Sequence, residues 1–138
     1  MRSLVVEDTR VVQMILEKLL EPYGECQVAK NGVEAIDAFH RAFGEKRPFD
    51  LVCLDIGLPD LDGREVLSRI RASEELRGLE EGQKVPVIAI TAASDTATVR
   101  YVVERGDGYI VKPINREKLV ENLVRLGLIP AAEPRTES

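Results

Sequence analysis

This sequence contains few residues of the types that form disulfides or bind structural zinc. It has two cysteines, one histidine and no tryptophan in 138 residues. Cys26 and Cys53 lie in apolar segments without a CxxC spacing or a histidine cluster, so we predict small core residues in a reducing cytosol rather than zinc ligands. The single histidine, His40, falls within a helical pattern, and we assign it no catalytic role.

Long hydrophobic runs and an excess of positive charge are also absent. The N-terminal apolar stretch, residues 4–6, ends at two acids, which fits neither a secretory signal nor a membrane span. The chain has 19 Lys and Arg residues against 24 Asp and Glu residues, a net charge of −5. Its overall field therefore does not attract nucleic acid or an anionic membrane. We predict a soluble cytoplasmic protein without a direct nucleic-acid or membrane partner.

Short apolar runs alternate with segments of helical period, and the length suits one domain. The runs predict strands at residues 3–8, 25–30, 49–55, 84–91 and 108–113. The helical segments are residues 9–24, 31–46, 63–76, 94–106 and 115–127. Strands that are apolar on both faces and separated by helices indicate a parallel sheet covered on both sides. We predict an α/β fold, a doubly wound sandwich with a five-stranded parallel sheet between two layers of helices.

The helical segments also show which residues face the core and which cap the helix ends. The first helix places apolar residues at helical spacing, at Val11, Val12, Ile15, Leu16, Leu19 and Leu20. Asn115 is expected to cap the last helix, and Ser94 or Asp95 the one before it. The acidic stretch 73–84 is long for a connection, so we expect it to extend the preceding helix or to form a mobile flap.

Polar residues interrupt the apolar strands mainly at their C-terminal ends. Glu7 and Asp8 end the first strand, Asp55 the third, Thr91 the fourth and Lys112 the fifth. These strand ends form the crevice where ligands bind in an open parallel sheet. Three carboxylates in one crevice repel one another and need a cation or a raised pKa. Oxygen ligands without His or Cys favour a hard ion such as Mg²⁺.

A metal next to a lysine and a threonine hydroxyl makes a receptor for a phosphoryl group. A carboxylate can take up that group as an acyl phosphate, so Asp55 is the predicted nucleophile. It needs no separate base because it is already ionised. In-line positioning and neutralisation of the phosphoryl oxygens would come from the metal, Lys112 and Thr91.

Four motifs on alternating strands together resemble a known family. They are "VVED" at the first strand end, "LVCLDIGLPDLDG" at the third, "IAITA" at the fourth and "GYIVKP" at the fifth. In this combination the chain resembles the receiver domain of bacterial response regulators, the two-component signalling family of the chemotaxis response regulator. The resemblance covers about residues 3–127. It implies a flavodoxin-like sheet with strand order 2-1-3-4-5, a receiver domain at 1–127 and a flexible tail at 128–138.

The resemblance implies a phosphoacceptor and a metal site. Asp55 would accept the phosphoryl group from a histidine kinase or a histidine phosphotransfer protein. Glu7, Asp8, Asp55 and the backbone carbonyl of Gly57 would hold Mg²⁺. Such a domain catalyses its own phosphorylation and dephosphorylation and is not a turnover enzyme.

The resemblance also implies a phosphoryl-binding pair and a switch. Lys112 would contact the phosphoryl group, ahead of Pro113 in a turn that can contain a cis bond. Thr91 would bind a phosphoryl oxygen, and Tyr109 would swing inward as the switch aromatic. The surface altered would be residues 95–126, where a downstream protein or a second copy of the chain would bind.

Three departures from the family pattern concern the lifetime of the phosphate and the switch. Glycine stands at position 57 and alanine at position 93, two places that influence how water reaches the acyl phosphate in this family. Small side chains neither block nor orient that water, so the lifetime is left open. The stretch from Thr91 to Tyr109 is about one residue shorter than is usual, which affects the end of the fourth helix and the swing of Tyr109.

Other functions fit parts of the same pattern. The chain could be the receiver domain of a hybrid histidine kinase or a phosphorelay intermediate. An aspartyl-nucleophile phosphatase would carry a general acid at position 57, where this chain has glycine. A nucleotide-binding module would offer glycine or hydroxyl donors where "EDTR" presents carboxylates. A degenerate, structural receiver would not need the full set of acids and lysine.

Overall fold

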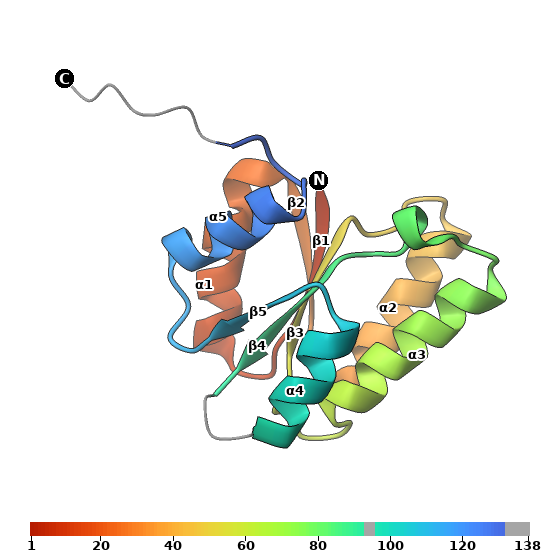
Figure 1. Ribbon diagram of the computed structural model, residues 1–138, viewed down its shortest axis with the longest axis horizontal. Helices are drawn as coiled ribbons and strands as arrows, with labels where there is room; N and C mark the ends of the chain where they lie inside the picture. The colour runs from red at the N-terminus through yellow and green to blue at the C-terminus, as the bar shows by residue number, and fades with distance from the viewer. Residues whose placement is uncertain (93–95, 132–138) are drawn as a thin grey trace.

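Figure 1 shows a computed structural model of the chain, which describes residues 1–92 and 96–131. The strands are β1 (Arg2–Val6), β2 (Glu25–Ala29), β3 (Leu51–Asp55), β4 (Val87–Thr91) and β5 (Gly108–Val111). The α-helices are α1 (Arg10–Leu20), α2 (Gly32–Gly44), α3 (Gly63–Leu76), α4 (Thr96–Arg105) and α5 (Arg116–Arg125). The strands pair in parallel in the order 2-1-3-4-5. The predicted fold class and strand order are therefore confirmed.

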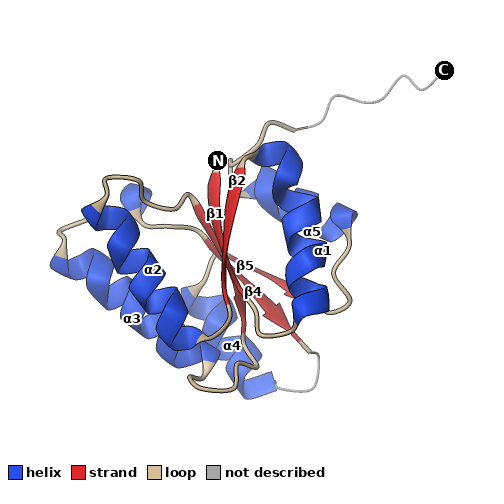
Figure 2. Cartoon of the chain, turned by 180° about the vertical axis from the view of Figure 1, so that it is seen from behind, coloured by secondary structure: helices blue, strands red, loops and turns tan. Residues whose placement is uncertain are grey.

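Helices cover both faces of the sheet. Side chains of α2 and α3 pack on one face, and those of α1 and α5 pack on the other (Figures 1 and 2). All residues of β3 and β4 are buried, which explains why their sequences are apolar on both faces. A strand covered on both faces approaches solvent at its ends. Because the strands are parallel, their C-terminal ends lie at the same edge of the sheet. Polar residues at the C-terminal ends therefore gather at that edge.

The predicted cap of the last helix is present in the structure. Asn115 caps α5, since its side-chain oxygen accepts a hydrogen bond of 2.9 Å from the Lys118 amide. Asn31 caps α2 in the same way, at 2.8 Å from the Glu34 amide. The predicted caps of α4, Ser94 or Asp95, lie outside the described residues.

The buried face of α1 differs from a simple apolar stripe. Val11 and Ile15 are exposed, together with Met14, while Gln13 is buried beside Leu16. The Gln13 side-chain amide donates a hydrogen bond of 2.7 Å to the backbone carbonyl of Glu7. This bond compensates the burial of a polar group. The apolar residues that share helical spacing on α1 are therefore divided between the core and the surface.

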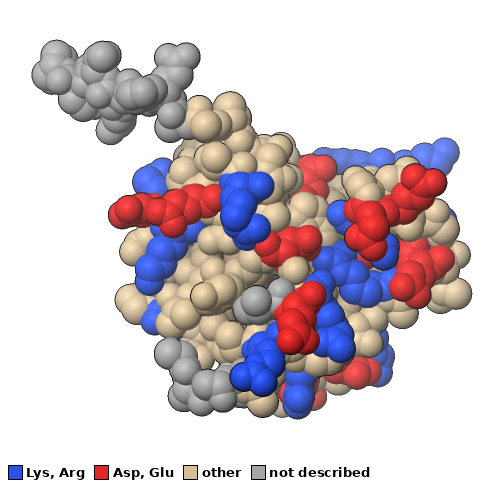
Figure 3. Space-filling view, viewed as in Figure 1, with Lys and Arg blue, Asp and Glu red and all other residues tan. Residues whose placement is uncertain are grey.

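The stretch 73–84 is anchored rather than a mobile flap. It extends α3 as far as Leu76 and then forms a short 3-10 helix, η2 (Glu81–Gln83). The Glu74 side chain is completely buried, and it accepts hydrogen bonds from the Val85 amide at 2.6 Å and from Arg71 at 2.7 Å. On the molecular surface over α3 and α4, positive and negative side chains lie side by side (Figure 3).

The C-terminal segment begins with residues that pack on the domain. Leu128 and Ile129, which follow α5, lie against the hydrophobic cluster between the sheet, α1 and α5. Residues 132–138 of the expected tail lie outside the described residues. Within the part of the chain that the structure describes, none of the helices is long and apolar enough to cross a membrane.

Candidate phosphoacceptor and metal site

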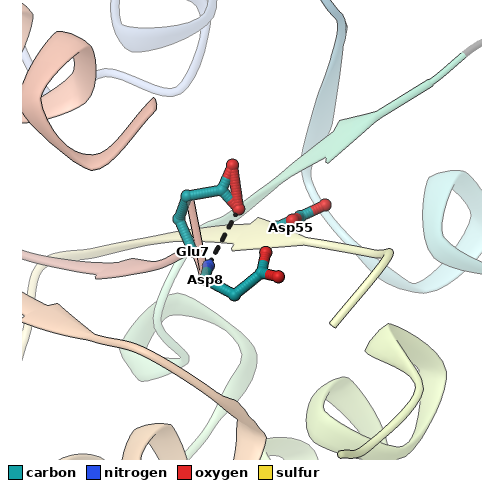
Figure 4. A group of neighbouring side chains, drawn as sticks. All are labelled: Glu7, Asp8 and Asp55. Carbon is teal, nitrogen blue, oxygen red and sulfur yellow. Dashed lines mark hydrogen bonds between the residues drawn. The ribbon is translucent and has the colours of Figure 1, made fainter. Parts of the chain in front are cut away.

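Three carboxylates converge where β1 and β3 end. Glu7 and Asp8 directly follow β1, and Asp55 is the last residue of β3. One oxygen from each of the three carboxylates lies within 4.8 Å of the others. Figure 4 shows the three side chains gathered at this edge, with the Asp8 amide donating to the Glu7 carboxylate at 3.1 Å. Glu7 and Asp55 are buried, and Asp8 is exposed, so the cluster opens toward solvent on one side.

Asp55 is held by a backbone donor and faces a cation. The Gly57 amide donates a hydrogen bond of 3.0 Å to its Oδ1 atom. The Lys112 ammonium lies 3.6 Å from its Oδ2 atom and 3.3 Å from Oε1 of Glu7. One lysine thus contacts two of the three carboxylates. This single positive charge does not neutralise the cluster, which leaves a net negative pocket.

Burial and the neighbouring Asp55 both disfavour the charged form of the Glu7 carboxyl. Burial raises its pKa to about 8, and a hydrogen bond with Asp55 and the negative charge of Asp55 act in the same direction. Lys112 opposes the shift without cancelling it. The raised pKa means that the protonated form of Glu7 is favoured more than in a free glutamate.

The donor set fits Mg²⁺. All three side chains offer oxygen ligands, which hard divalent cations prefer. Lys112 is the cation that contacts Glu7 and Asp55 among the described residues, and a divalent ion would supply the further positive charge that three carboxylates need. A site with few carboxylates and an opening to solvent suits an ion that keeps part of its water shell. Glu7, Asp8 and Asp55 are the side chains that would hold it.

The raised pKa of Glu7 predicts that Mg²⁺ binding depends on pH. Because the pKa of Glu7 is raised to about 8, its proton must leave when the metal binds below that pH. We expect Mg²⁺ affinity to rise from pH 6 to pH 8, by up to about tenfold per unit, and then to level off. Titration calorimetry in buffers of different ionisation enthalpy would count the released proton. The Glu7→Gln variant should bind more weakly and lose this pH dependence, whereas a flat profile in the wild type would contradict the assignment.

The other predicted residues of the pocket also meet here. A cavity of about 380 Å³ is lined by Asp8, Thr9, Asp55, Ile56, Gly57, Thr91, Ala92 and Lys112. Thr91 is buried at the end of β4, and its hydroxyl donates to the Ala92 carbonyl at 2.8 Å. The peptide bond between Lys112 and Pro113 is cis. The structure thus brings Asp55, Thr91 and Lys112 around one space of a size that admits a phosphoryl group.

Tyr109 does not line this cavity. Its side chain is 48% exposed on β5, the edge strand. Its register partner on β4 is Ala89, two residues before Thr91. The ring therefore lies outside the pocket in this conformation, and an inward movement toward Thr91 remains a prediction.

Sequence reasoning missed two residues of the site. Thr9 lines the cavity between Asp8 and α1, and nothing in the sequence distinguishes it from an ordinary helix cap. Gln13 supports the backbone of Glu7 from α1. A glutamine between the apolar residues Val12 and Leu16 was a signal, since a polar side chain on an inward face needs a partner.

The comparisons with known proteins agree with this geometry. The family model of the response regulator receiver domain matches residues 3–124. The chemotaxis protein CheY-3 of Vibrio cholerae is 33% identical over 129 residues, which cover 91% of this chain and 91% of that protein.

Two solved receiver domains have the same fold. The receiver domain of the sensor histidine kinase PA1611 of Pseudomonas aeruginosa, with a magnesium ion coordinated in its active-site cleft, is 30% identical, with a TM-score of 0.70. The match covers 90% of this chain and 94% of that chain. The receiver domain of Ssk1 of Saccharomyces cerevisiae, solved with the histidine phosphotransfer protein Ypd1, is 25% identical. Its TM-score is 0.76, over 95% of this chain and 93% of that chain.

Several relatives are histidine kinases of much greater length. The chain spans 12% of a probable histidine kinase from Oryza sativa and 7% of a hybrid histidine kinase from Dictyostelium discoideum. The match to the receiver model, in contrast, extends over nearly the whole chain, and all four motifs lie within it. The chain belongs to the response regulator receiver domain family.

Proposed function

We propose that this chain is a Mg²⁺-dependent phosphoacceptor in which Asp55 takes a phosphoryl group from a phosphohistidine. The donor would be a histidine kinase or a histidine phosphotransfer protein. One observation carries the proposal. A buried carboxylate at a strand end lies 3.6 Å from a lysine, beside two further acids, and lines an open cavity.

The chain's own residues supply the chemistry of transfer. An oxygen of Asp55 forms the new bond to phosphorus while the bond between phosphorus and the donor's imidazole nitrogen breaks. That nitrogen keeps the electron pair of the broken bond. Lys112 binds an oxygen of the phosphoryl group during transfer, and the Thr91 hydroxyl turns from the Ala92 carbonyl to donate to another oxygen. Mg²⁺, when bound, neutralises part of the negative charge of the three carboxylates and the phosphoryl oxygens.

Phosphorylation would then change the packing next to Thr91. The new group adds about 1.5 to 2 negative charges and three strong acceptors. If the Thr91 side chain moves toward it, space opens behind the hydroxyl, and Tyr109 can leave its exposed position to fill that space. Two packing arrangements of this kind form a switch. The changed surface would be residues 95–126, of which residue 95 lies outside the described residues, and it would engage a downstream protein or a second copy of the chain.

A direct test uses a small phosphodonor. The protein is incubated with acetyl phosphate, with and without Mg²⁺, and its intact mass is measured. We expect a gain of one phosphoryl group that requires the metal. Beryllofluoride uptake, measured in parallel, separates a short-lived phosphoaspartate from an inactive site. Failure of both labelling and Mg²⁺ binding would refute the proposal.

The phosphodonor would dock on the exposed apolar face of α1. Val11, Met14 and Ile15 are 65%, 54% and 40% exposed, and residues at this spacing lie on one face of a helix. The face begins two residues after Thr9, which lines the phosphoacceptor cavity. An apolar patch at the rim of a reactive site is typical of a protein-docking surface. The complex of the Ssk1 receiver domain with Ypd1 supports a partner of this class.

Replacing Met14 with glutamate should separate docking from chemistry. We expect transfer from a phosphohistidine protein to slow by about tenfold, because a charge would be placed in an apolar contact. Labelling by acetyl phosphate, which needs no docking, should stay within about twofold of the wild type. Leu76→Glu is the matched control, since Leu76 is 90% exposed at the end of α3. Equal transfer rates for Met14→Glu and Leu76→Glu would exclude α1 as the docking face.

The receiver domain of a hybrid kinase is the second candidate, favoured by the long histidine kinases among the relatives. Turnover catalysis is disfavoured, because position 57 carries no acid that could protonate a leaving group. We also propose a cytoplasmic location, where the kinase domains of such systems act. The domain limits 1–127 and the tail 128–138 remain predictions.

A further inference from the structure

The loop between β3 and α3, residues 56–62, contains Gly57, which lines the phosphoacceptor cavity. Its base is closed by a hydrogen bond of 3.2 Å from the Gly63 amide to the Ile56 carbonyl. A Cβ atom on Gly63 would lie 2.8 Å from the Cα atom of Ile56, so the two ends of the loop approach very closely. The Ile56 amide is in turn bonded to the Ile90 carbonyl of β4 at 3.0 Å. The base of the loop is thus fixed to the sheet.

The far side of the loop is tied to a different helix through Asp60. One carboxylate oxygen of Asp60 accepts from the Gly32 amide at 2.9 Å, and the other accepts from the Val33 amide at 3.0 Å. Burial of this carboxyl opposes its ionisation, but the backbone amides that donate to it outweigh this effect and lower its pKa. Asp60 is therefore a charged acceptor that bridges the loop to the first turn of α2.

Close packing supports the same tie. A Cβ atom on Gly32 would lie 2.8 Å from Cβ of Leu61 and 2.9 Å from a methyl carbon of Val66. Only glycine lets the loop come this close to α2. The contact is made by residues 28 positions apart in the chain, Gly32 and Asp60.

Asp60 does more than complete the end of α2. The helix already has its own cap, Asn31, which accepts from the Glu34 amide. The Asp60 carboxylate accepts from the Gly32 and Val33 amides, which the Asn31 side chain does not bond. Together with the packing of Leu61 near Gly32, these hydrogen bonds join the loop to α2. The position of the loop is therefore set at its base by the sheet and on its far side by α2.

We infer that Asp60 is a positioning residue for the phosphoacceptor, acting through Gly57. Gly57 lies on the loop between its fixed base and Asp60, and its amide donates the 3.0 Å hydrogen bond to Oδ1 of Asp55. Holding the loop against α2 holds this amide, and the amide sets the orientation of the carboxylate that would bind metal and accept phosphate. The inference rests on the proposed function of Asp55.

The experiment compares Asp60→Ala with the wild type by three measurements. Hydrogen exchange of the Gly32, Val33 and Gly57 amides reports the tie directly. Mg²⁺ affinity, measured by calorimetry, reports the orientation of Asp55. Acetyl phosphate labelling is followed at low and at saturating Mg²⁺.

We expect all three amides to exchange faster, including the Gly57 amide, and Mg²⁺ affinity to fall by about tenfold, as for other residues that orient metal ligands. Labelling should slow at low Mg²⁺ and recover to within about twofold at saturating Mg²⁺. Asp37→Ala is the matched control, because it removes an exposed carboxylate of α2 that pairs with Arg41 on the same helix. It should change none of these quantities beyond about twofold.

Two results distinguish the possible failures. If Gly32 and Val33 exchange faster in Asp60→Ala while Gly57 exchange and Mg²⁺ affinity are unchanged, Asp60 is only a helix cap and the inference is wrong. If the wild type itself neither binds Mg²⁺ nor takes up phosphate, the proposed function fails and the inference fails with it.

Discussion

The Asp55→Asn variant is expected to gain no phosphoryl group from acetyl phosphate, under conditions in which the wild type gains one. An amide oxygen is a far weaker nucleophile than a carboxylate, and no acyl phosphate can form on it. The variant should still fold, because asparagine has the same shape and its oxygen can accept from the Gly57 amide, which lies 3.0 Å from Oδ1 of Asp55. Intact-mass spectrometry with and without Mg²⁺ measures the effect.

Asp50→Asn is the matched control for this variant. Asp50 immediately precedes β3, at the opposite end of the same strand, and it accepts a hydrogen bond of 2.7 Å from the Arg2 amide. We expect it to label like the wild type. A phosphoryl group on Asp55→Asn would show that another residue is the acceptor, and peptide mapping would identify it.

The Arg71→Met variant is expected to lose about 3 kcal/mol or more of unfolding free energy, because it leaves a buried carboxylate without its cation. Arg71 donates to the fully buried Glu74 at 2.7 Å and to the Val85 carbonyl at 2.9 Å. Its other terminal nitrogen pairs with Asp107 at 2.9 Å. The Asp107 carboxylate also accepts from the amide at the start of β4. One guanidinium therefore joins α3, the entry to β4 and the connection between α4 and β5.

Urea unfolding of Arg71→Met and Arg69→Met tests this expectation. Arg69 lies on the same helix and pairs with Glu65, but both side chains are about half exposed, at 54% and 49%. Surface pairs of this kind contribute about 1 kcal/mol or less, so Arg69→Met should change the midpoint only slightly. If the two variants are equally stable, the buried pair does not hold these segments together.

A double variant separates the cost of an unpaired charge from the value of the pair. When both Arg71 and Glu74 are replaced by methionine, no buried carboxylate is left without a partner. Replacement of a buried ion pair by apolar residues is often close to neutral. The double variant should therefore recover part of the stability that Arg71→Met loses, provided that the Val85 amide finds another acceptor.

Some residues of the site stand out in the local sequence, and others are recognised only from their contacts in the fold. Asp55 and Lys112 could be placed because each charged residue interrupts an apolar run, which is visible within a few residues of sequence. Tyr109 has an ordinary position on an edge strand, so its role cannot be determined from the pattern alone. Gln13 supports Glu7 through a contact that depends on how α1 packs against the sheet.

The alternation of strands and helices, the parallel sheet and the gathering of acids with a lysine at one edge could all be predicted from the order of amino acids alone. These features follow from hydrophobic period and from the cost of burying charge, both of which act locally along the chain. The three-dimensional packing, in contrast, ties the loop of Asp60 to α2 and places Arg71 between Glu74 and Asp107. It also left Val11 and Met14 on the surface of α1. The contacts of Asp60 with Gly32 and of Arg71 with Asp107 join residues that are distant in sequence. They depend on which helix faces meet, a choice that no short pattern encodes.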